Sequence, residues 1–426
     1  MSREMRHSGI EWIGDIPRDW EVNIIGNLYQ VRNEKVSDKD FPPLSVTMNG
    51  IVPQLETAAK TNNGDDRKLV CKGDFAINSR SDRRGSCGVS QYDGSVSLIN
   101  TILKPRGSMN SQFYNWLFHT ELFADEFYKW GHGIVDDLWT TRWQEMKNIS
   151  IVYPSLSEQQ IIANYLDEVC GNIDEMVALQ EKMIEELKAY KQSVITEAVT
   201  KGLNPNVPMR NSGIDWIGEI PEHWEIQRLR TLGWTQNGIS QSGDYFGDDY
   251  AYPFVNYSDA YKNYSVPYPE GKANSSEEDR KRYSLVEGDV LFTRTSETIE
   301  EIGFSSTCLE TIKDAVYSGF LIRFRPTSNK LYKGFSKYYF RSQIHRAYFV
   351  KQMNIVTRAS LGQDLLKNLV VLLPTLSEQQ QIASYLEEKC SEIDSLITIK
   401  QQKIEELKEY KKSVIYEYVT GKKEVV

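Results

Sequence analysis

The stretch "PSLSEQQIIANYLDEVCGNID" (154–174) returns as "PTLSEQQQIASYLEEKCSEID" (374–394), at an offset of 220 residues. Two further pairs of segments repeat in the same order. "SGIEWIGDIP" (8–17) matches "SGIDWIGEIP" (212–221), and "KMIEELKAYKQSVITEAVTKG" (182–202) matches "KIEELKEYKKSVIYEYVTGK" (403–422). Three collinear repeats indicate a tandem duplication. Each half consists of a short phrase, a variable region and a long helical segment.

This order divides the 426-residue chain into four parts. We predict two variable domains, over residues 1–154 and 206–374, each followed by a long helical segment, over 155–205 and 375–426. Short apolar runs bounded by Gly, Asp and Pro, such as "DFAINS" and "GFLIRFRP", indicate strands in the variable regions. Aromatic-rich stretches at 111–130 and 333–350 indicate helices, with their aromatic residues in the core. The predicted fold class is α/β (α+β).

Each long segment begins with a capping signal and continues as a heptad pattern. Ser157 and Ser377, each followed by Glu-Gln-Gln, predict a capping box at the helix start. Apolar residues then alternate at steps of four and three, which predicts a coiled-coil seam. The predicted pairing residues are Ile162, Leu166, Ile173, Met183, Leu187, Tyr190 and Val194 in the first copy, and Ile382, Leu386, Ile393, Leu407, Tyr410 and Val414 in the second. Val169, Met176 and Leu396 extend the pattern.

Two helices of one origin are expected to pair with each other. We predict an antiparallel pair related by a pseudo-twofold axis, with the variable domains at its opposite ends. Gln180 and Lys400 are polar at equivalent seam positions, and they either fix the register or lie at an exposed edge. Gly171 favours a break near the start of the first helix. The 28 residues from Ile173 to Thr200 would span about 42 Å.

The repeated phrase is interpreted as structural. Trp12, Pro17 and Trp20 recur as Trp216, Pro221 and Trp224, where the second phrase directly follows the first long helix. By symmetry, the first phrase should lie near the end of the second helix, around Val419. The two ends of the chain, Met1 and Val426, should therefore be close together.

The composition is that of an ordinary globular protein. Hydrophobic residues make up 40% of the chain, and no run of residues is long and apolar enough to span a membrane. The start "MSREMRHSGIEW" lacks the apolar region of a secretory signal, so a cytoplasmic location is expected. The five cysteines form no C-x-x-C pair, which favours reduced, mostly buried thiols over disulfides or a zinc site. No metal site is predicted.

Motifs for catalysis are missing from the sequence. There is no Walker A motif, G-x-G-x-x-G after a strand, H-E-x-x-H, G-x-S-x-G or [DN]-P-P-[FYW]. The net charge of −9 argues at first against nucleic acid, but its distribution matters more. The variable regions carry only −2 and 0, whereas the two helical segments carry −5 and −2. A near-neutral domain can still present one basic face, and it would bind DNA weakly without a partner.

Three pairs of loops are candidates for such a face. "NSRSDRRG" (78–85) follows the strand-like "GDFAI", and "TRTSETIEE" (293–301) follows "GDVLF". The segments 130–143 and 352–364 precede each long helix, and "SVTMNGIV" (45–52) corresponds to "FVNYSDAYKN" (254–263). Arg, Asn and Thr contact base edges and phosphates; the alternative for each is a solvated loop with local salt bridges. The DNA-binding candidates are Asn78, Arg80, Arg83, Arg84, Thr47, Asn49, Thr141, Arg142, Arg294, Thr295, Asn256, Tyr257, Thr357 and Arg358.

The framework resembles the specificity subunits of Type I restriction–modification systems. The resemblance rests on "EWIGDIPRDW" (11–20), "DWIGEIPEHW" (215–224), "YPSLSEQQ" (153–160), "LPTLSEQQ" (373–380), "AVTKG" (198–202) and "YVTGK" (418–422). It covers the framework twice in the right order, whereas the variable regions match no member closely. The resemblance implies that each variable region is a target-recognition domain for one half of a bipartite, asymmetric site in double-stranded DNA.

The resemblance also implies partners and chemistry that the residues alone do not show. The spacer helices would set the gap between half-sites and dock two methylation subunits, and motor-nuclease subunits would join through the complex. S-adenosylmethionine for N6-adenine methylation, ATP and Mg²⁺ would be bound by those partners, and no cofactor by this chain. The chain would be a non-catalytic subunit. The alternatives are a methylation-only system, a coiled-coil scaffold without a DNA role, and a self-contained nuclease or methyltransferase.

Overall fold

The computed structural model describes residues 3–54, 64–133, 139–240, 245–247, 249–296, 302–345, 348–349 and 359–425. The chain forms two compact units. Unit 1 comprises Met1–Glu181 with Gln401–Val426, and unit 2 comprises Lys182–Lys400. Each unit therefore contains one variable region together with part of both long helices, so the compact units are divided differently from the four predicted segments. No helix in the described part of the chain is long and apolar enough to cross a membrane.

Unit 1 is built around a four-stranded antiparallel sheet with the order β10-β9-β12-β4. The same unit contains a three-stranded sheet, with the order β11-β8-β5, and the hairpin β6-β7. Strand β3 pairs with β13. The elements before the first long helix are β1 (Met5–His7), β2 (Asp15–Pro17), β3 (Glu21–Ile24), α1 (Ile25–Leu28), β4 (Tyr29–Arg32), β5 (Lys35–Val36), β6 (Leu44–Thr47), β7 (Gly50–Pro53), β8 (Arg67–Val70), β9 (Phe75–Asn78), the 3-10 helix η1 (Ser81–Arg83), β10 (Cys87–Val89), β11 (Gly94–Val96), β12 (Asn100–Pro105), α2 (Ser111–Phe118), α3 (Glu121–Lys129), α4 (Trp143–Met146) and β13 (Ser150–Tyr153).

Unit 2 repeats the central sheet in the order β17-β24-β20-β22, and β16 pairs with β26 as β3 pairs with β13. Its elements outside the long helices are β14 (Met209–Asn211), β15 (Glu219–Pro221), β16 (Glu225–Arg228), α6 (Leu229–Leu232), β17 (Gly233–Asn237), β18 (Tyr252–Val255), α7 (Tyr257–Lys262), β19 (Lys272–Ala273), α8 (Glu277–Arg282), β20 (Val290–Thr293), β21 (Thr295–Ser296), β22 (Ser305–Thr307), β23 (Val316–Tyr317), β24 (Leu321–Pro326), α9 (Lys333–Tyr339), β25 (Ala359–Ser360), α11 (Gln363–Lys367) and β26 (Val370–Leu373). The predicted mixture of strands and helices and the predicted duplication are both confirmed.

The aromatic-rich stretches are helical, and they supply the core. In unit 1 the predicted helix over 111–130 is two helices, α2 and α3, because Thr120 caps α3 by accepting a hydrogen bond from the backbone N–H of Phe123. Phe113, Phe118 and Phe127 are buried against the sheet. In unit 2 α9 supplies buried aromatic residues in the same way. All five cysteines are free, and four of them are buried.

The repeated phrase lies against the end of a long helix in both units. In unit 2, a Cβ on Gly202, just past the end of the first long helix, would lie 3.3 Å from the ring of Trp224. In unit 1, Gly421 is packed against Pro17 and Trp20 in the same manner. The backbone φ angles of Gly202 and Gly421 are +75° and +71°, a conformation that favours glycine after a helix.

The first phrase therefore lies beside the end of the second helix, as predicted. The Lys422 Nζ donates a hydrogen bond to the Ile13 carbonyl over 2.8 Å, and Val419 shares a core with Trp20. Val425 also packs against this core, which includes Ile10 and Trp20 of the first phrase and its neighbourhood. Met1 and Val426 themselves lie outside the described residues.

The long helices α5 (Leu156–Lys201) and α12 (Leu376–Val419) begin two residues earlier than the predicted caps would place them. Ser155 accepts a hydrogen bond from the backbone N–H of Glu158 over 3.3 Å. Thr375 accepts the equivalent bond from Glu378, whose carboxylate accepts one from the Thr375 N–H in return. The prediction that Ser157 and Ser377 cap the helices was wrong, because the preceding Ser and Thr already occupy the capping position.

Helix α5 is continuous over 46 residues, or about 69 Å. The predicted break at Gly171 is absent from the described helix: Gly171 is exposed, and a Cβ there would meet no other atom within 4 Å. The cost of glycine in the helix is small relative to the packing that holds its neighbours Cys170 and Ile173.

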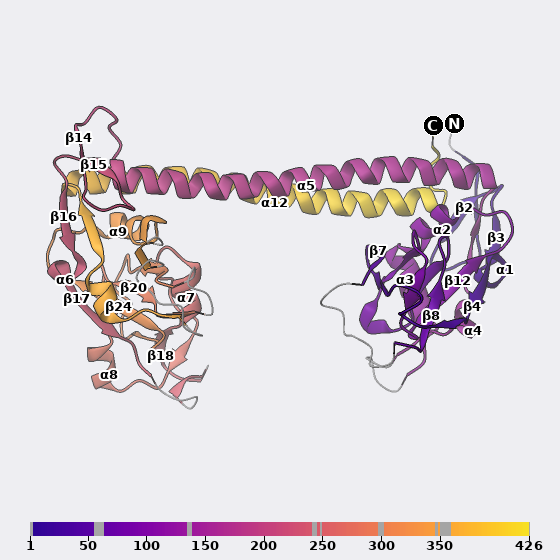
Figure 1. Cartoon of the computed structure of the whole chain (residues 1–426), viewed down its shortest axis with the longest axis horizontal. Coiled ribbons are helices and arrows are strands. Elements are labelled where there is room, and N and C mark those ends of the chain that lie inside the picture. Colours follow the sequence, from indigo (N-terminus) through magenta and orange to yellow (C-terminus); the bar gives the residue numbers. More distant parts are fainter. Residues whose placement is uncertain are drawn as a thin grey trace. The chain divides into compact units, whose positions relative to one another are not determined.

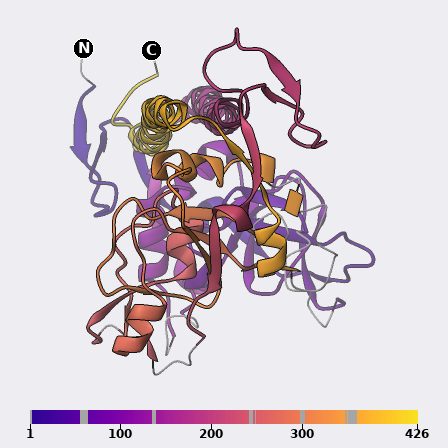
Figure 2. The ribbon, with the colours of Figure 1, turned by 90° about the vertical axis from the view of Figure 1, so that its left-hand side faces the viewer.

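The two helices run antiparallel within each unit (Figure 1), and Figure 2 views them along their length. In unit 1, Lys411 pairs with Asp174 over 2.6 Å, and the Tyr165 and Tyr418 rings are 4.5 Å apart. Residue numbers thus rise along one helix as they fall along the other. In unit 2, Lys191 pairs with Asp394 over 2.6 Å. The two ion pairs are equivalents at the 220-residue offset, and the predicted antiparallel coiled coil is confirmed.

The predicted seam was one residue out of register in part of each helix. Tyr190 and Tyr410 are 59% and 55% exposed, and Met176 and Leu396 are exposed as well. Lys191 and Lys411 occupy the seam instead, with their alkyl stems half-buried and their ammonium groups paired to aspartate. The buried or half-buried residues of the seam are Ile162, Leu166, Ile173, Val177, Met183, Ile184, Leu187 and Val194 in α5, and Ile382, Leu386, Ile393, Ile397, Ile404, Leu407 and Val414 in α12.

The seam can be tested with two leucines of the same helix. Leu386 is fully buried, whereas Leu396 is 48% exposed. We expect Leu386→Ala to lower the free energy of unfolding by about 2–5 kcal/mol, because it leaves a cavity in the core of unit 2. Leu396→Ala should change it by less than about 0.5 kcal/mol. Urea unfolding of the isolated chain measures both values, and equal losses would contradict the assigned register.

Candidate nucleic-acid interface

The same turn precedes the central strand of each unit. Gly73 and Gly288 have φ angles of +89° and +88°, which glycine adopts without strain. The following Asp74 and Asp289 are buried, and each accepts a hydrogen bond from the backbone N–H three residues before it, over 2.9 and 2.8 Å. The alignment of the two Gly-Asp pairs, made on sequence, is therefore also structural, and the loops after β9 and β20 are equivalent.

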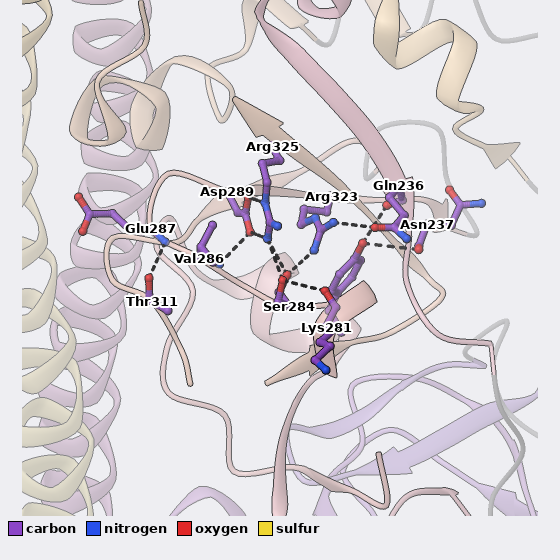
Figure 3. Close-up of polar contacts among 11 residues, drawn as sticks. Gln236, Asn237, Lys281, Ser284, Val286, Glu287, Asp289, Thr311, Arg323 and Arg325 are labelled. Atoms are coloured by element: carbon purple, nitrogen blue, oxygen red, sulfur yellow. Dashed lines mark hydrogen bonds and ion pairs between the residues drawn. The ribbon is translucent and has the colours of Figure 1, made fainter. Parts of the chain in front are cut away.

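A buried ion pair fixes each of these turns. In unit 1, Arg32 on β4 donates to Asp74 over 2.7 Å. In unit 2, Arg325 on β24 donates to both oxygens of Asp289, over 2.7 and 2.6 Å, and also to the Ser284 carbonyl (Figure 3). The hydrogen bond to Asp289 raises the pKa of Arg325 above its usual value. These arginines are structural, because their donors are used inside the protein.

Arg323 extends this network in unit 2. Its side chain is fully buried and donates to Gln236 over 2.6 Å and to the Ser284 carbonyl (Figure 3). Its guanidinium carbon also lies 4.7 Å from the centroid of the Trp234 ring. Burial lowers the pKa of Arg323 below its usual value. The network joins β17, β24 and the segment after α8, and through Asp289 it also holds the turn that leads into β20.

The contribution of the Arg325–Asp289 ion pair to stability can be compared with that of the Lys333–Glu287 pair. Asp289→Ala should lower the free energy of unfolding by about 3 kcal/mol, because Arg325 would lose a buried partner. Glu287→Ala is the matched control, since Glu287 forms an exposed pair with Lys333 and should cost less than about 1 kcal/mol. Urea unfolding distinguishes them, and a small effect of Asp289→Ala would show that the turn does not depend on the pair.

In unit 1, two of the predicted DNA-contact loops meet in one cleft. Its volume is about 830 Å³. The loop after β9 contributes Asn78, Arg80, Arg83 and Arg84, and the β6-β7 hairpin contributes Thr47. The third candidate loop also lies beside this cleft, because Thr141 donates its backbone N–H to the Ser79 carbonyl over 3.0 Å. Segments from three regions of the sequence therefore surround one basic depression.

The arginines around this cleft differ in their accessibility. Arg83 projects into solvent, and its guanidinium forms an ion pair with the adjacent Asp82 at 3.8 Å. Arg84 is also exposed, although it pairs with Asp125 and lies over the Tyr128 ring. Arg80 is half-buried. Arg83 and Arg80 therefore present the most available positive charge to a ligand in the cleft.

Several predicted contacts have structural roles instead. Thr141 is fully buried and donates its hydroxyl to the Phe127 carbonyl over 2.8 Å, so its prediction as a DNA contact was wrong. Asn256 caps α7 by accepting from the Asp259 N–H. The Thr47 hydroxyl closes the β6-β7 turn by donating to Gly50. Asn78 is buried and its side-chain oxygen accepts from the Arg80 N–H, so it shapes the arginine loop.

The remaining candidates are more dispersed. Asn49 is exposed at the β6-β7 turn, and Arg142 is exposed at the start of α4. In unit 2, Thr295 pairs with Ser360 between β21 and β25, and the Tyr257 ring stacks on Tyr261 within α7. Thr357 and Arg358 lie outside the described residues.

Arg294 is the cation that directly follows β20. Its backbone N–H donates to the Phe320 carbonyl over 2.9 Å, and its guanidinium lies 3.4 Å from the Gly319 carbonyl. Sequence reasoning missed Phe320, which is strongly exposed, and the exposed Met48 and Ile99 on the rim of the unit 1 cleft. A single sequence gave no signal for them, because apolar residues in short runs are most often core. In the described residues, no cluster of three or more His, Cys, Asp or Glu residues is arranged to hold a metal ion.

Together these features define a class of protein: two modules of one origin, each with an arginine-containing loop after its central strand, joined to a shared pair of helices. Comparisons agree with this class. Residues 221–409 match the model of the Type I restriction modification DNA specificity domain. The chain is 25% identical to the Type I restriction enzyme MjaVIII specificity subunit of Methanocaldococcus jannaschii, over 96% of this chain and 93% of the relative.

Solved structures share the fold. A chain from work on complex assembly and conformational transition of the type I R-M system has a TM-score of 0.73 at 14% identity, covering 95% of this chain and 99% of that one. The HsdS subunit from Thermoanaerobacter tengcongensis has a TM-score of 0.53 at 16% identity, covering 95% and 98%. Part of the chain thus matches the family model, and nearly all of it is similar to a Type I restriction enzyme specificity subunit.

Proposed function

We propose that this chain directs the DNA-modifying subunits of a Type I system to one asymmetric, two-part sequence and itself catalyses neither methylation nor cleavage. The observation that carries this proposal is the duplicated architecture with different loops. Both units repeat the Gly-Asp turn, the central sheet and the framework phrase, whereas the residues after β9 and β20 differ. One framework with two different reading surfaces matches two different half-sites.

Under this proposal, residues 1–154 and 206–374 are the two target-recognition domains. The paired helices fix the gap between the half-sites, and the cytoplasm is the expected location. Each variable region is near neutral, and affinity for the DNA backbone rises with the number of phosphates neutralised. Phosphate binding would therefore be shared between this chain and its partners. Partner subunits would supply the rest of that positive charge.

The reading role of the cleft can be tested in the assembled complex. Replacing Arg80 and Arg83 with Ala should relax or abolish recognition of one half-site only, because both residues belong to unit 1. The matched control is Arg18→Ala. Arg18 belongs to unit 1, pairs with Glu4 and is as exposed as Arg83. The methylated motif is measured by mapping methylated adenines across the genome. The map is made in a host with the gene, without it, and with each variant.

The expected result is a gapped motif that requires the gene, with one half degenerate in the double variant and intact in Arg18→Ala. A motif that persists without the gene would refute the proposed function. A wild-type motif in the double variant would remove the cleft from the reading surface while leaving the function in place.

The helices also carry a surface suited to partner docking. On α5, Met176 and Leu179 are exposed on one face, away from the seam, and on α12 the equivalent Leu396 and Ile399 are exposed in the same way. Tyr190 and Tyr410 form a third such pair. Each unit thus carries the same exposed apolar set. We propose that these two sets dock two copies of one partner, the methylation subunit, and that motor-nuclease subunits join through it.

The chemistry would then reside on the partners. S-adenosylmethionine would be bound by the methylation subunits for transfer to adenine N6, and ATP and Mg²⁺ would be bound by the partner subunits that methylate, move along and cut DNA. This division supports the view that the present chain contributes sequence choice and assembly. A system that only methylates would use the same chain without the nuclease.

Stoichiometry tests the docking surface. Leu396→Asp with Ile399→Asp should reduce the complex from two methylation subunits per chain to one, and Met176→Asp with Leu179→Asp should remove the other. A charged group in an apolar contact would cost several kcal/mol of binding energy. Gln402→Asp, at an exposed polar position of α12, is the control. Light scattering of the purified complexes measures the mass, and retention of two partners in both double variants would refute this surface.

A further inference from the structure

Each unit has the same tight turn leading into the strand beside its central strand. In unit 1 the turn is Ser97–Asn100 and closes with the Asn100 N–H donating to the Ser97 carbonyl over 3.1 Å. In unit 2 the turn is Ser318–Leu321 and closes with the equivalent bond over 2.9 Å. The strands that follow, β12 and β24, are both six residues long and end in proline. The two turns are therefore structural equivalents.

An exposed apolar side chain occupies the same place in both turns. Ile99 is 36% exposed and Phe320 is 61% exposed. An apolar side chain that stays in contact with water forgoes part of the free energy that its burial would contribute. A polar residue would be the expected choice at a turn tip. The surrounding sequences of the two turns differ, yet both place an apolar group at this one position.

The backbone at this position is held firmly. The Ile99 carbonyl accepts a hydrogen bond from the Ser79 N–H over 3.3 Å, and the Phe320 carbonyl accepts one from the Arg294 N–H over 2.9 Å. Ser79 and Arg294 follow the central strands of their units. The Gly319 N–H also donates to the Ile239 carbonyl over 2.7 Å, an approach that a side chain on Gly319 would obstruct. Phe320 therefore projects from a fixed platform.

Positive charge accompanies the apolar tip in both units. Ile99 lines the same cleft as Arg80, Arg83 and Arg84. In unit 2 the Arg294 guanidinium lies against the turn itself, at the Gly319 carbonyl. A ligand that satisfies both features must offer anionic groups beside a flat apolar surface. Among the partners open to this protein, DNA has that chemistry, with phosphates outside and base faces within.

We propose that Phe320 and Ile99 are wedge residues, each of which makes apolar contact with a base step in the half-site read by its own unit. This inference rests on the proposed function and adds a specificity-determining residue to it. The arginine loop beside each tip would hold the phosphates while the apolar side chain partly unstacks neighbouring bases. Steps that unstack easily, such as pyrimidine–purine steps, would then be favoured without a hydrogen bond to a base.

Fluorescence of 2-aminopurine tests this contact. The complex with methylation subunits is bound to duplexes of its mapped site, each with 2-aminopurine at one position, and fluorescence and affinity are measured. Wild-type complex should increase the fluorescence at one step in each half-site. Phe320→Ala should abolish the increase in the half-site of unit 2 only and weaken binding about tenfold. Phe320→Trp should retain both properties, and Ile99→Ala should affect only the other half-site.

Tyr268→Ala is the control, because Tyr268 is an exposed aromatic residue of the same unit and should leave fluorescence and affinity unchanged. If Phe320→Ala behaves like Tyr268→Ala, or if Phe320→Trp loses binding as fully as Phe320→Ala, the wedge is refuted. The proposed function fails differently, because wild-type complex would then show no preference for any duplex. The removal of an exposed side chain should leave the thermal unfolding midpoint unchanged, which the same samples report.

Discussion

The two long helices complete the hydrophobic core of each unit, and the rest of the architecture depends on this sharing. In unit 1, Ile162 and Leu166 from the start of α5 pack in one core with Val414 and Val419 from the end of α12. In unit 2, Ile195 from the end of α5 packs with Leu386 from the start of α12. Neither variable region buries its apolar face without residues from distant parts of the sequence. The chain must therefore bring its last residues back to its first before unit 1 is whole.

This constraint explains where the sequence repeats and where it does not. The repeated segments supply helix ends, caps, the tryptophans under the helix ends and the lysine–aspartate pairs of the seam, all of which serve the shared core. Arg80, Arg83 and Arg84 after β9 and Arg294 after β20 are not members of these cores, so the sequence at these positions is free to differ. A framework bound so closely by packing is recognisable from sequence, and it allows the reading surface to change with little effect on stability.

The sequence predicted the paired helices correctly, because packing between helices imposes a heptad repeat. It failed where two neighbouring residues both fit one position of that repeat. The heptad pattern correctly indicated paired helices, but Tyr190 and Lys191 are adjacent, and hydrophobicity favoured the tyrosine. The structure places the lysine stem in the seam, because its ammonium group reaches Asp394. The capping prediction failed for the same reason. Ser155 and Ser157 can both cap a helix, and only the start of the apolar contacts decides between them.

The candidate site was predictable in its location but not in its individual contacts. The strand–loop position of the arginines was correct, because the Gly-Asp turn marks it in both copies. Thr141 and Asn256 were misassigned because hydroxyl and amide groups build turns and caps as readily as they bind DNA. Phe320 was missed for the opposite reason: an apolar residue before a strand is indistinguishable by sequence from a core residue. Exposure, which only the fold determines, separates the two.

Arginine illustrates why charge alone does not identify the reading surface. Three arginines donate their hydrogen bonds to aspartate, carbonyl and amide oxygens inside the fold, namely Arg32, Arg323 and Arg325. The Arg83 side chain, in contrast, is exposed to solvent. Arg32 and Arg325 nevertheless bear on the position of the exposed arginines, because they fix the turn that leads into the strand after which those arginines lie. A rigid turn with few free cations gives a small, well-oriented electrostatic contact rather than a strong one. Under the proposed function, such a contact would need the phosphate-binding surface of a partner for affinity, and this need would tie sequence choice to the assembled complex.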